Sequence, residues 1–311
     1  ILDSGFKRCY RTIMNSKVLE GISRAKINLH LAVLGRRGDG YHNISTLMAE
    51  LELADRLALR IIKISADCET SVSVIDSGGT CSHITGGIEP GKNLISIGAM
   101  NYLKRVDTQA VVEFSIVKNI PSGAGLGGGS SNAACAIELI RRALGRERDK
   151  AVFSAAAETG SDVPFFLYGG FALASGRGEV VEPVDFSCKY HVILVNNGIH
   201  VNTAEAYRVL RRDYLYNGPD HTDNSTLMKK YMGKLDNWKK VMKNDFEDAI
   251  FPLYPELGNV KEELYGLGAD YAAMTGSGST VFGVFESYNR AIDACDSLKN
   301  GNNVVLTKFA L

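Results

Sequence analysis

Residues 120–134, IPSGAGLGGGSSNAA, predict the fold more strongly than any other part of the chain. Five of the seven residues from Gly123 to Gly129 are glycines, and the run leads directly into a predicted helix. Such a loop exposes consecutive backbone N–H groups at a helix N-terminus, which carries partial positive charge and binds polyphosphate. The residues expected to contact a nucleotide's phosphates are Pro121, Gly123, Gly125, Leu126, Gly127, Gly128, Gly129, Ser130, Ser131 and Asn132.

Two better-known nucleotide motifs are matched only in part. Residues 123–128 (GAGLGG) fit the dinucleotide fingerprint, but the next predicted element after the helix is a second helix, where that fold requires a parallel strand. Residues 86–93 (GGIEPGKN) have the spacing of a P-loop, but Asn93 replaces the Ser or Thr that ligates magnesium. We interpret residues 86–93 as a loop that caps a helix, with a looser contact to a nucleotide as the alternative.

Helices and strands are mixed around the loop. Alternating apolar residues predict strands at 25–35, 57–64, 71–75 and 111–117, and helical stripes predict helices at 93–106, 130–144 and 148–158. In the strand at 25–35, Ile27, Leu29, Leu31 and Val33 share one face, and Lys26, Asn28 and His30 share the other. Elements of both kinds continue beyond residue 190, and residues 217–225 read as a surface loop. The class is therefore α+β with two domains and a boundary near 175–185.

Composition bounds the function. A chain of 311 residues suits about two domains. With 35 Lys+Arg against 35 Asp+Glu, it lacks the basic surface of a nucleic-acid or anionic-membrane binder, so local groups must hold any anion. No apolar run approaches the ~20 residues of a membrane span, and six scattered cysteines predict reduced thiols in a cytosol-like compartment. Residues 1–13 are interpreted as an added extension, with the remnant of a targeting peptide as the alternative.

Several motifs together resemble the GHMP small-molecule kinases. The glycine-rich string is similar to their central phosphate-binding motif, AKINLHLAVLGRRGDGYHNI (25–44) to their amino-terminal motif, and GSDVPFFLYGG (160–170) to their aspartate motif. MTGSGSTVFGVF (274–285) resembles their carboxy-terminal glycine motif, and NDFEDAIFPLYPEL (244–257) another family segment. The string Asp39-Gly40-Tyr41-His42 is typical of the branch that acts on 4-diphosphocytidyl-2-C-methyl-D-erythritol.

The resemblance implies a GHMP kinase fold. Residues 14–178 would form an ATP-binding domain like the second domain of ribosomal protein S5, and residues 179–311 a ferredoxin-like domain. It also implies ATP- and Mg²⁺-dependent phosphorylation of the 2-hydroxyl of the cytidine diphosphate methylerythritol, in non-mevalonate isoprenoid synthesis. A bacterial protein of this kind is cytoplasmic, and a plastid location follows if residues 1–13 are a targeting remnant. Monomer and homodimer both stay open, as do the magnesium ligands.

Phosphoryl transfer needs a group that takes the hydroxyl proton and a cation that stabilises developing charge. The family motifs place Asp162 as the base and Lys26 as its partner, with Asn28 as a substrate contact on the same strand face. Tyr41 and His42 suit a cytidine base, and the resemblance adds a second stacking ring, for which Tyr207 has the right spacing. Further expected substrate contacts are Asp39, Thr275, Gly276 and Ser277, and the expected adenosine contacts are Lys118, Asn93 and Leu94.

Two alternatives remain at this stage. A homoserine or mevalonate kinase of the same family would share the phosphate loop but would not need Tyr41 and His42. A nucleotide-binding sensor without catalysis could use the same scaffold, although the presence of Lys26 and Asp162 argues against it.

Overall fold

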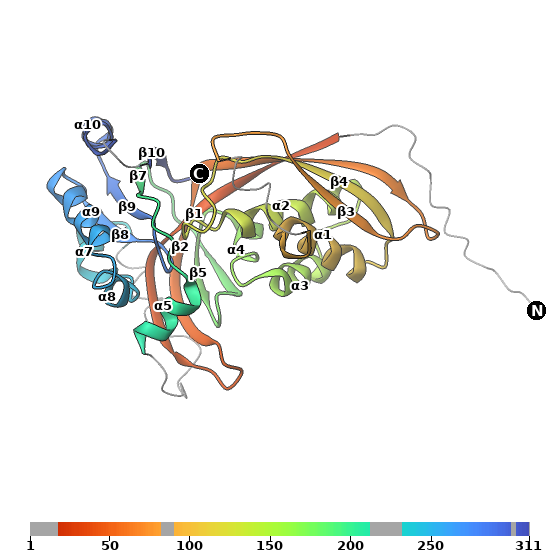
Figure 1. Ribbon diagram of the computed structural model, residues 1–311, viewed down its shortest axis with the longest axis horizontal. Coiled ribbons are helices and arrows are strands. Elements are labelled where there is room, and N and C mark those ends of the chain that lie inside the picture. The colour runs from red at the N-terminus through yellow and green to blue at the C-terminus, as the bar shows by residue number, and fades with distance from the viewer. Residues whose placement is uncertain (1–17, 82–89, 212–231, 300–302, 311) are drawn as a thin grey trace, which may run out of the picture.

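The computed structural model describes residues 18–81, 90–211, 232–299 and 303–310. Within these residues it contains two β-sheets, which lie side by side along an elongated molecule (Figure 1). Four helices pack on the first sheet, and the remaining helices surround the second (Figure 1). The α+β class predicted from the sequence is confirmed.

The first sheet is built on a long antiparallel hairpin of β1 (Val18–Arg36) and β2 (His42–Ile64). Its strand order is β3-β4-β2-β5-β6, with β1 paired to β2. The other strands are β3 (Ser71–Asp76), β4 (Ala110–Val117), β5 (Phe171–Ser175) and β6 (Val180–Val184). One face is covered by α1 (Leu94–Arg105), α2 (Gly128–Ala143), α3 (Lys150–Thr159) and the short α4 (Phe165–Tyr168), with η2 (Pro90–Lys92) preceding α1.

The second sheet is antiparallel, with strand order β10-β7-β9-β8. Its strands are β7 (His191–Asn196), β8 (Tyr271–Met274), β9 (Val281–Phe285) and β10 (Asn303–Lys308). The helices around it are α5 (Thr203–Leu210), η3 (Leu235–Asn237), α7 (Trp238–Val241), α8 (Glu247–Ile250), α9 (Pro255–Gly266) and α10 (Tyr288–Leu298).

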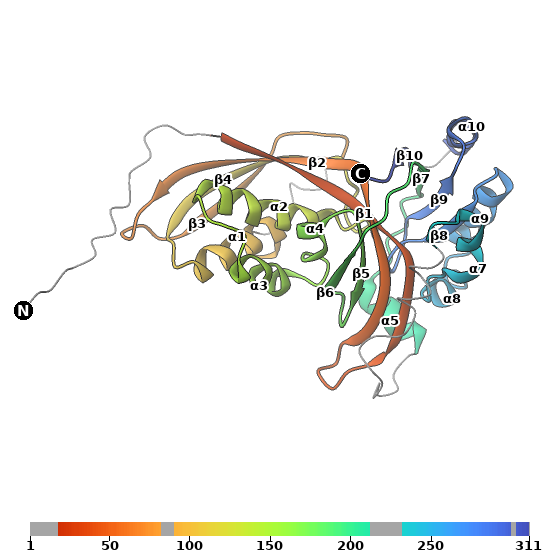
Figure 2. The same ribbon diagram turned by 180° about the vertical axis from the view of Figure 1, so that it is seen from behind.

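The β1–β2 hairpin joins the two halves. Its residues Ile27 and Leu29 share one hydrophobic cluster with Val192, Tyr271 and Phe282 of the second sheet. In both views the hairpin, which belongs to the first sheet, extends past the elements of the second sheet (Figures 1 and 2). The middle of β1 is therefore buried between the two sheets, and its polar residues lie at their junction.

Most predicted elements of the first half are confirmed within a few residues. The main difference is the length of the hairpin strands, because β1 begins at Val18 and β2 at His42. The predicted boundary region, 175–185, falls within the β5–β6 hairpin: β6 pairs with β5, so the first sheet continues to Val184. The expectations for residues 1–13 and 217–225 lie outside the described residues.

The order of elements excludes the dinucleotide-binding fold. Helix α2 is followed by α3 and α4, and the next strand, β5, pairs with β2 in antiparallel orientation. In the described ranges, no helix is both long and apolar enough to cross a membrane. Cys68, Cys81, Cys135, Cys188 and Cys295 are all free thiols, as predicted for these five.

Candidate active site

The glycine-rich loop adopts a backbone that only glycine takes easily. Gly123, Gly125 and Gly127 have φ values of 69°, 76° and 68°, in the left-handed region, and Gly127 is the N-cap of α2. At Gly125 a Cβ atom would lie 2.4 Å from the carbonyl oxygen of Thr275, in the glycine motif that follows β8. The two glycine motifs, 150 residues apart in the chain, therefore touch through their backbones.

A cavity of about 860 Å³, here called the donor cavity, extends along this loop. Its walls come from the loop, the first turn of α2, the start of α1, and β3. The predicted nucleotide contacts that line it are Pro121, Gly123, Gly125, Leu126, Gly127, Gly128, Gly129, Ser130, Asn132, Lys118, Asn93 and Leu94. Asn93 also caps α1, because its side chain accepts a hydrogen bond from the N–H of Ile95 at 2.9 Å.

Three further expected nucleotide contacts also bond to other residues: Ser131, Lys118 and Asn132, whose Oδ1 accepts the Ser23 hydroxyl at 2.5 Å. Ser131 does not line the donor cavity; its hydroxyl oxygen lies 2.8 Å from that of Ser23 on β1. Lys118 lines the cavity, but its Nζ lies 2.5 Å from Oδ2 of Asp55, which is fully buried. The other oxygen of Asp55 accepts the N–H groups of Asn119 and Ile120, at 2.7 and 2.8 Å. The buried Lys118–Asp55 pair therefore holds the backbone at the start of the glycine-rich loop.

Lys26 and Asp162 meet at the junction of the two sheets. Asp162 lies in the turn between α3 and α4, where Pro164 is the N-cap of α4, and Lys26 projects from β1. The Lys26 Nζ is 3.3 Å from Asp162 Oδ2 and donates to Asn28 Oδ1 at 2.7 Å. Lys26 is buried, whereas about a third of the Asp162 side chain, 34%, is exposed. A fixed cation thus lies beside an accessible carboxylate.

Asn28 is held in a single orientation by its neighbours. Its Nδ2 donates to the hydroxyl of Thr46 on β2 at 2.8 Å, and that hydroxyl donates to the carbonyl of His30 at 2.6 Å. The backbone N–H of Asn28 donates to the Thr275 hydroxyl at 3.0 Å. The amide oxygen is therefore directed at Lys26, and the network connects both sheets around the catalytic pair.

The predicted alternation along β1 is wrong at His30. The pairing with β2 shifts between Asn28 and His30, leaving Leu29 as an extra residue in a β-bulge. A bulge reverses which side chains share a face. Leu31 therefore lines the cavity around Lys26 and Asn28, which is described next, and His30 does not. His30 is buried, and its Nδ1 instead accepts the backbone N–H of Lys243 at 3.1 Å.

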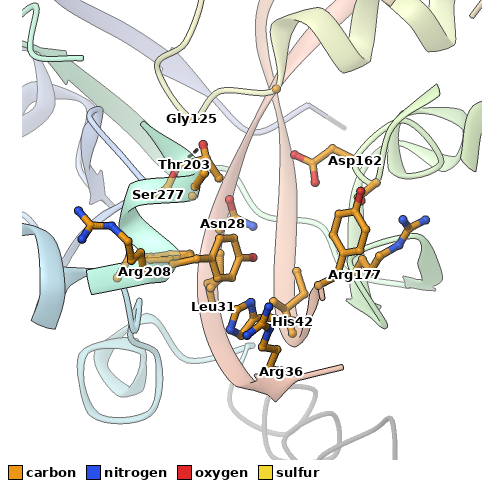
Figure 3. Close-up of a pocket in the computed structure, with 18 of the residues that line it drawn as sticks. Asn28, Leu31, Arg36, His42, Gly125, Asp162, Arg177, Thr203, Arg208 and Ser277 are labelled. Carbon is orange, nitrogen blue, oxygen red and sulfur yellow. Dashed lines mark hydrogen bonds between the residues drawn. The ribbon is translucent and has the colours of Figure 1, made fainter. Parts of the chain in front are cut away.

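A second cavity, of about 800 Å³, surrounds the catalytic pair and is called the acceptor cavity (Figure 3). It contains most of the predicted substrate residues: Lys26, Asn28, Tyr41, His42, Asp162, Tyr207, Gly276 and Ser277. Gly125, Gly127 and Thr203 line both cavities. The acceptor cavity therefore opens onto the donor cavity beside the glycine-rich loop.

Aromatic side chains from both halves enter the acceptor cavity. His42, at the start of β2, stacks on Tyr207 of α5 with ring centroids 4.8 Å apart and an interplanar angle of 18°. Tyr207 also meets the edge of Phe246 at 4.9 Å. Burial, together with the charge of Asp162, raises the pKa of the Tyr207 hydroxyl to about 12, so it stays protonated at neutral pH. Tyr207, the second stacking ring expected from the sequence, thus lies in the acceptor cavity.

Two expected substrate contacts do not line the cavity. Asp39 is at the tip of the β1–β2 hairpin, where its carboxylate accepts from the N–H of Tyr41 at 3.1 Å and pairs with Arg37. These bonds lower the pKa of Asp39, with the Tyr41 N–H as the largest contributor. Thr275 is fully buried and bonds to Asn28. Asp39 bonds to the backbone of Tyr41 and Thr275 to that of Asn28, so both contact residues that line the cavity.

Several cavity residues were missed by the sequence analysis. They are Arg36, Ser161, Arg177, Thr203 and Arg208. Four basic residues, Lys26, Arg36, Arg177 and Arg208, thus line the acceptor cavity with the single carboxylate of Asp162, and Arg177 and Arg208 also pair with Glu179 and Glu205. A chain of zero net charge therefore contains a locally positive cavity, suited to an anionic ligand. Among the described residues, no group of three or more His, Cys, Asp or Glu side chains could hold a metal ion.

A phosphate-binding loop beside a lysine–aspartate pair, on two sheets joined by one hairpin, defines a small-molecule kinase. Two family models match the chain: "GHMP kinases N terminal domain" at residues 93–170 and "GHMP kinases C terminal" at residues 227–303. The chain belongs to the GHMP kinases. This confirms the family resemblance.

Individual relatives refine the comparison. Proteins named 4-diphosphocytidyl-2-C-methyl-D-erythritol kinase are 38% identical in Azobacteroides pseudotrichonymphae (86% of this chain, 94% of that one) and 37% in Bacteroides fragilis (84% and 90%). A crystal structure of 4-(cytidine 5'-diphospho)-2C-methyl-D-erythritol kinase matches with a TM-score of 0.75 at 31% identity, over 94% of this chain and 100% of that one. Homoserine kinase from Cytophaga hutchinsonii shares the fold with a TM-score of 0.72 at 19% identity, over 96% and 97%.

Proposed function

We propose that this protein transfers the γ-phosphoryl group of ATP to the 2-hydroxyl of 4-diphosphocytidyl-2-C-methyl-D-erythritol, a step of non-mevalonate isoprenoid synthesis. The observation that carries the proposal is the Lys26–Asp162 pair in a cavity that adjoins the glycine-rich loop. The names of relatives at 37–38% identity over most of their length support the choice of substrate.

ATP occupies the donor cavity in this proposal. The N–H groups of the glycine-rich loop and the N-terminus of α2 hold its phosphates, and the cavity between β3 and α1 receives its adenosine. Magnesium arrives as part of the MgATP substrate. The hydroxyl of Ser130, at the start of α2, is an oxygen ligand of the kind that magnesium prefers.

The substrate's diphosphate and cytidine occupy the acceptor cavity. Arg36 and Arg208 offer positive charge to the diphosphate, and the aromatic rings offer faces to the cytosine. The reacting hydroxyl lies beside Asp162, which accepts its proton as the oxygen attacks the γ-phosphorus. The bond from that phosphorus to the β,γ-bridging oxygen breaks, and ADP leaves.

Lys26 has two tasks in this step. Its ammonium group, held by Asn28, lies beside the Asp162 carboxylate and orients it toward the hydroxyl. It also offers positive charge to the oxygens around the transferred phosphoryl group, where the transition state spreads its negative charge. Because the lysine is buried, little water competes for this interaction.

The test is an assay of ADP release with three acceptors under identical conditions. The cytidine diphosphate methylerythritol should support turnover, whereas homoserine and mevalonate should support little above the rate without acceptor. Turnover with homoserine or mevalonate instead would assign the protein to another branch of the family. Binding of ATP without turnover on any of the three would favour a nucleotide-binding sensor.

A further inference from the structure

The hairpin between β5 and β6 brings one arginine to the rim of the acceptor cavity. The turn closes with a hydrogen bond from the N–H of Gly178 to the carbonyl of Ser175 at 3.0 Å. The carbonyl of Gly176 accepts the N–H of Ile44 on β2 at 2.8 Å. The hairpin tip is therefore attached to β2 two residues beyond His42, and Arg177 lies at this tip.

The Arg177 side chain is held by its own hairpin. The carboxylate of Glu179 accepts the backbone N–H of Arg177 at 2.6 Å and lies 3.5 Å from its Nε. At Gly176 a Cβ atom would meet this carboxylate at 2.9 Å, so glycine leaves room for Glu179 to fold back. The guanidinium is thus fixed in direction, although 31% of the side chain remains exposed.

The fixed guanidinium covers the ring of Tyr41. The Arg177 Cζ lies 4.9 Å from the ring centroid, within the range of a cation–π interaction. Tyr41 is 57% exposed, and among the described residues no aromatic ring packs on it. His42 and Tyr207, by contrast, restrain each other by stacking. Arg177 therefore restrains an exposed ring that no aromatic ring of the described residues restrains.

We propose that Arg177 is a positioning residue for nucleobase recognition: its guanidinium packs on one face of Tyr41 and holds the ring ready to stack on the cytosine. The proposal rests on the proposed function, because it assumes that Tyr41 contacts the base. It assigns Arg177 to the base rather than to the diphosphate, although its charge would suit either. The distinguishing feature is that its effect passes through the Tyr41 ring.

The expected effect is modest. A cation–π contact at an exposed site corresponds to roughly a two- to fivefold change in affinity. Arg177→Gln should raise the KM for the cytidine substrate by about that factor, with kcat and the KM for ATP unchanged. Arg177→Lys, which keeps the charge but loses the planar stacking group, should recover part of the affinity. Arg60→Gln, an exposed arginine on β2 that pairs with Glu113, is the matched control and should have no effect.

A double-mutant cycle with Tyr41→Leu tests whether Arg177 acts through the ring. Arg177→Gln should cost nothing further once Tyr41 is replaced, because there is no ring left to position. If Arg177→Gln raises the KM by the same factor in the Tyr41→Leu background as in the wild-type protein, the proposal is wrong. An unchanged KM in the single variant would also overturn it.

Equilibrium binding of cytidine and of CDP separates the two possible targets of Arg177 without needing catalysis. If Arg177 acts on the base through Tyr41, Arg177→Gln should weaken both ligands by the same factor. If it binds the diphosphate directly, only CDP should weaken, and the proposal is wrong. An inactive wild-type protein in the ADP assay would refute the proposed function, whereas the cytidine comparison would still decide the role of Arg177.

Discussion

The donor and acceptor cavities are built in different ways, although they share Gly125, Gly127 and Thr203. The donor cavity takes most of its predicted contacts from one continuous stretch, residues 121–132, through backbone groups and small side chains. The acceptor cavity takes charged and aromatic side chains from β1, β2, the α3–α4 turn, the β5–β6 hairpin and α5. One side of the site depends on backbone conformation, and the other on side chains that only the fold brings together.

This difference has a functional reason. A triphosphate presents repeated, flexible negative charge, which a row of N–H groups at a helix N-terminus satisfies without long side chains. An acceptor must instead present one hydroxyl at a defined point and be told apart from similar molecules. That requires specific hydrogen bonds, stacking and charge from several directions. The following predictions test the division, from the largest expected effect to the smallest.

Removing the carboxylate on the acceptor side should have the largest effect. Asp162→Asn keeps the shape but cannot take the hydroxyl proton, so kcat should fall by about 10²- to 10⁴-fold. The dissociation constant for ATP should stay within about twofold, because no donor-cavity contact is lost. Steady-state ADP release and fluorescence titration with a nucleotide analogue measure the two quantities. A variant that turns over at a near-normal rate would remove Asp162 from the role of base.

The buried ion pair below the glycine-rich loop should affect stability more than nucleotide affinity. Lys118→Met leaves the fully buried Asp55 without its cation, and breaking such a pair costs about 3–5 kcal/mol. Urea denaturation should show that loss, with the KM for ATP little changed in the folded protein. Lys104→Met, an exposed lysine on α1, is the control. Unchanged stability with a raised KM would instead make Lys118 a direct contact to the adenosine.

A methyl group in the donor loop should disturb the backbone on which that cavity depends. In Gly125→Ala the new Cβ would lie 2.4 Å from the Thr275 carbonyl oxygen, and φ stays unfavourable at 76°. The loop must shift, and we expect a loss in kcat/KM for ATP of about one to two orders of magnitude, in line with strain of ~1–3 kcal/mol.

Gly145 provides the matched control for this change. It also has a left-handed φ, 63°, but a Cβ there would meet nothing within 4 Å. Gly145→Ala should lower the melting temperature through its backbone strain and leave ATP kinetics unchanged. If both variants lose the same activity, global stability rather than loop geometry explains the loss at Gly125.

Loss of a stacking ring should affect only the acceptor side. Tyr207→Leu removes the partner of His42, and with base stacking worth about 1–3 kcal/mol the KM for the cytidine substrate should rise about tenfold. The KM for ATP should not follow it. Tyr207→Phe, which keeps the ring, should restore most of the affinity. A rise in both KM values would show that Tyr207 supports the site as a whole.

The backbone of the donor side could be predicted from the sequence because its information is local. A run of glycines ending in Ser-Ser-Asn implies a turn and a helix start wherever the chain places it, and α2 begins at Gly128. The Lys26, Asn28 and Asp162 assignments came from family motifs, and the structure brings these three side chains together. Ser131 does not line the donor cavity, because it lies on the side of the helix start that meets Ser23, and the sequence alone does not show which side that is.

The acceptor side was predicted less completely because its contacts are long-range. Arg177 lies in a turn, Ser-Gly-Arg-Gly-Glu, whose local signal is only the turn itself; its contact with Tyr41 spans more than a hundred residues of chain. The bulge at Leu29 has no signature in an otherwise regular alternation. The first residues of β1 were missed because Val18 and Ile22 are apolar but lie on the exposed side of the strand. The sequence there does not show the alternation of buried apolar and exposed polar residues that indicates a strand.

The bulge at Leu29 leads to the smallest predicted effect, on pH-dependent stability. Burial lowers the pKa of His30 to about 4 in the folded protein, with Asp245 opposing and Lys243 adding to the shift. Unfolded His30 titrates near its ordinary pKa of 6.5, so below that pH the unfolded state binds more protons and stability falls. Between pH 7.5 and 5.5 the free energy of unfolding should drop by about 1 kcal/mol from this group.

His30→Asn tests this assignment, because an asparagine oxygen can accept the Lys243 N–H without titrating. Urea denaturation at the two pH values should show the slope of stability with pH flattened in the variant by that amount. The KM for the cytidine substrate should stay unchanged, since His30 does not line the acceptor cavity. If the slope persists, other titrating groups account for it. If the KM for the cytidine substrate rises, the packing of residues 243–245 on β1 also shapes the acceptor cavity.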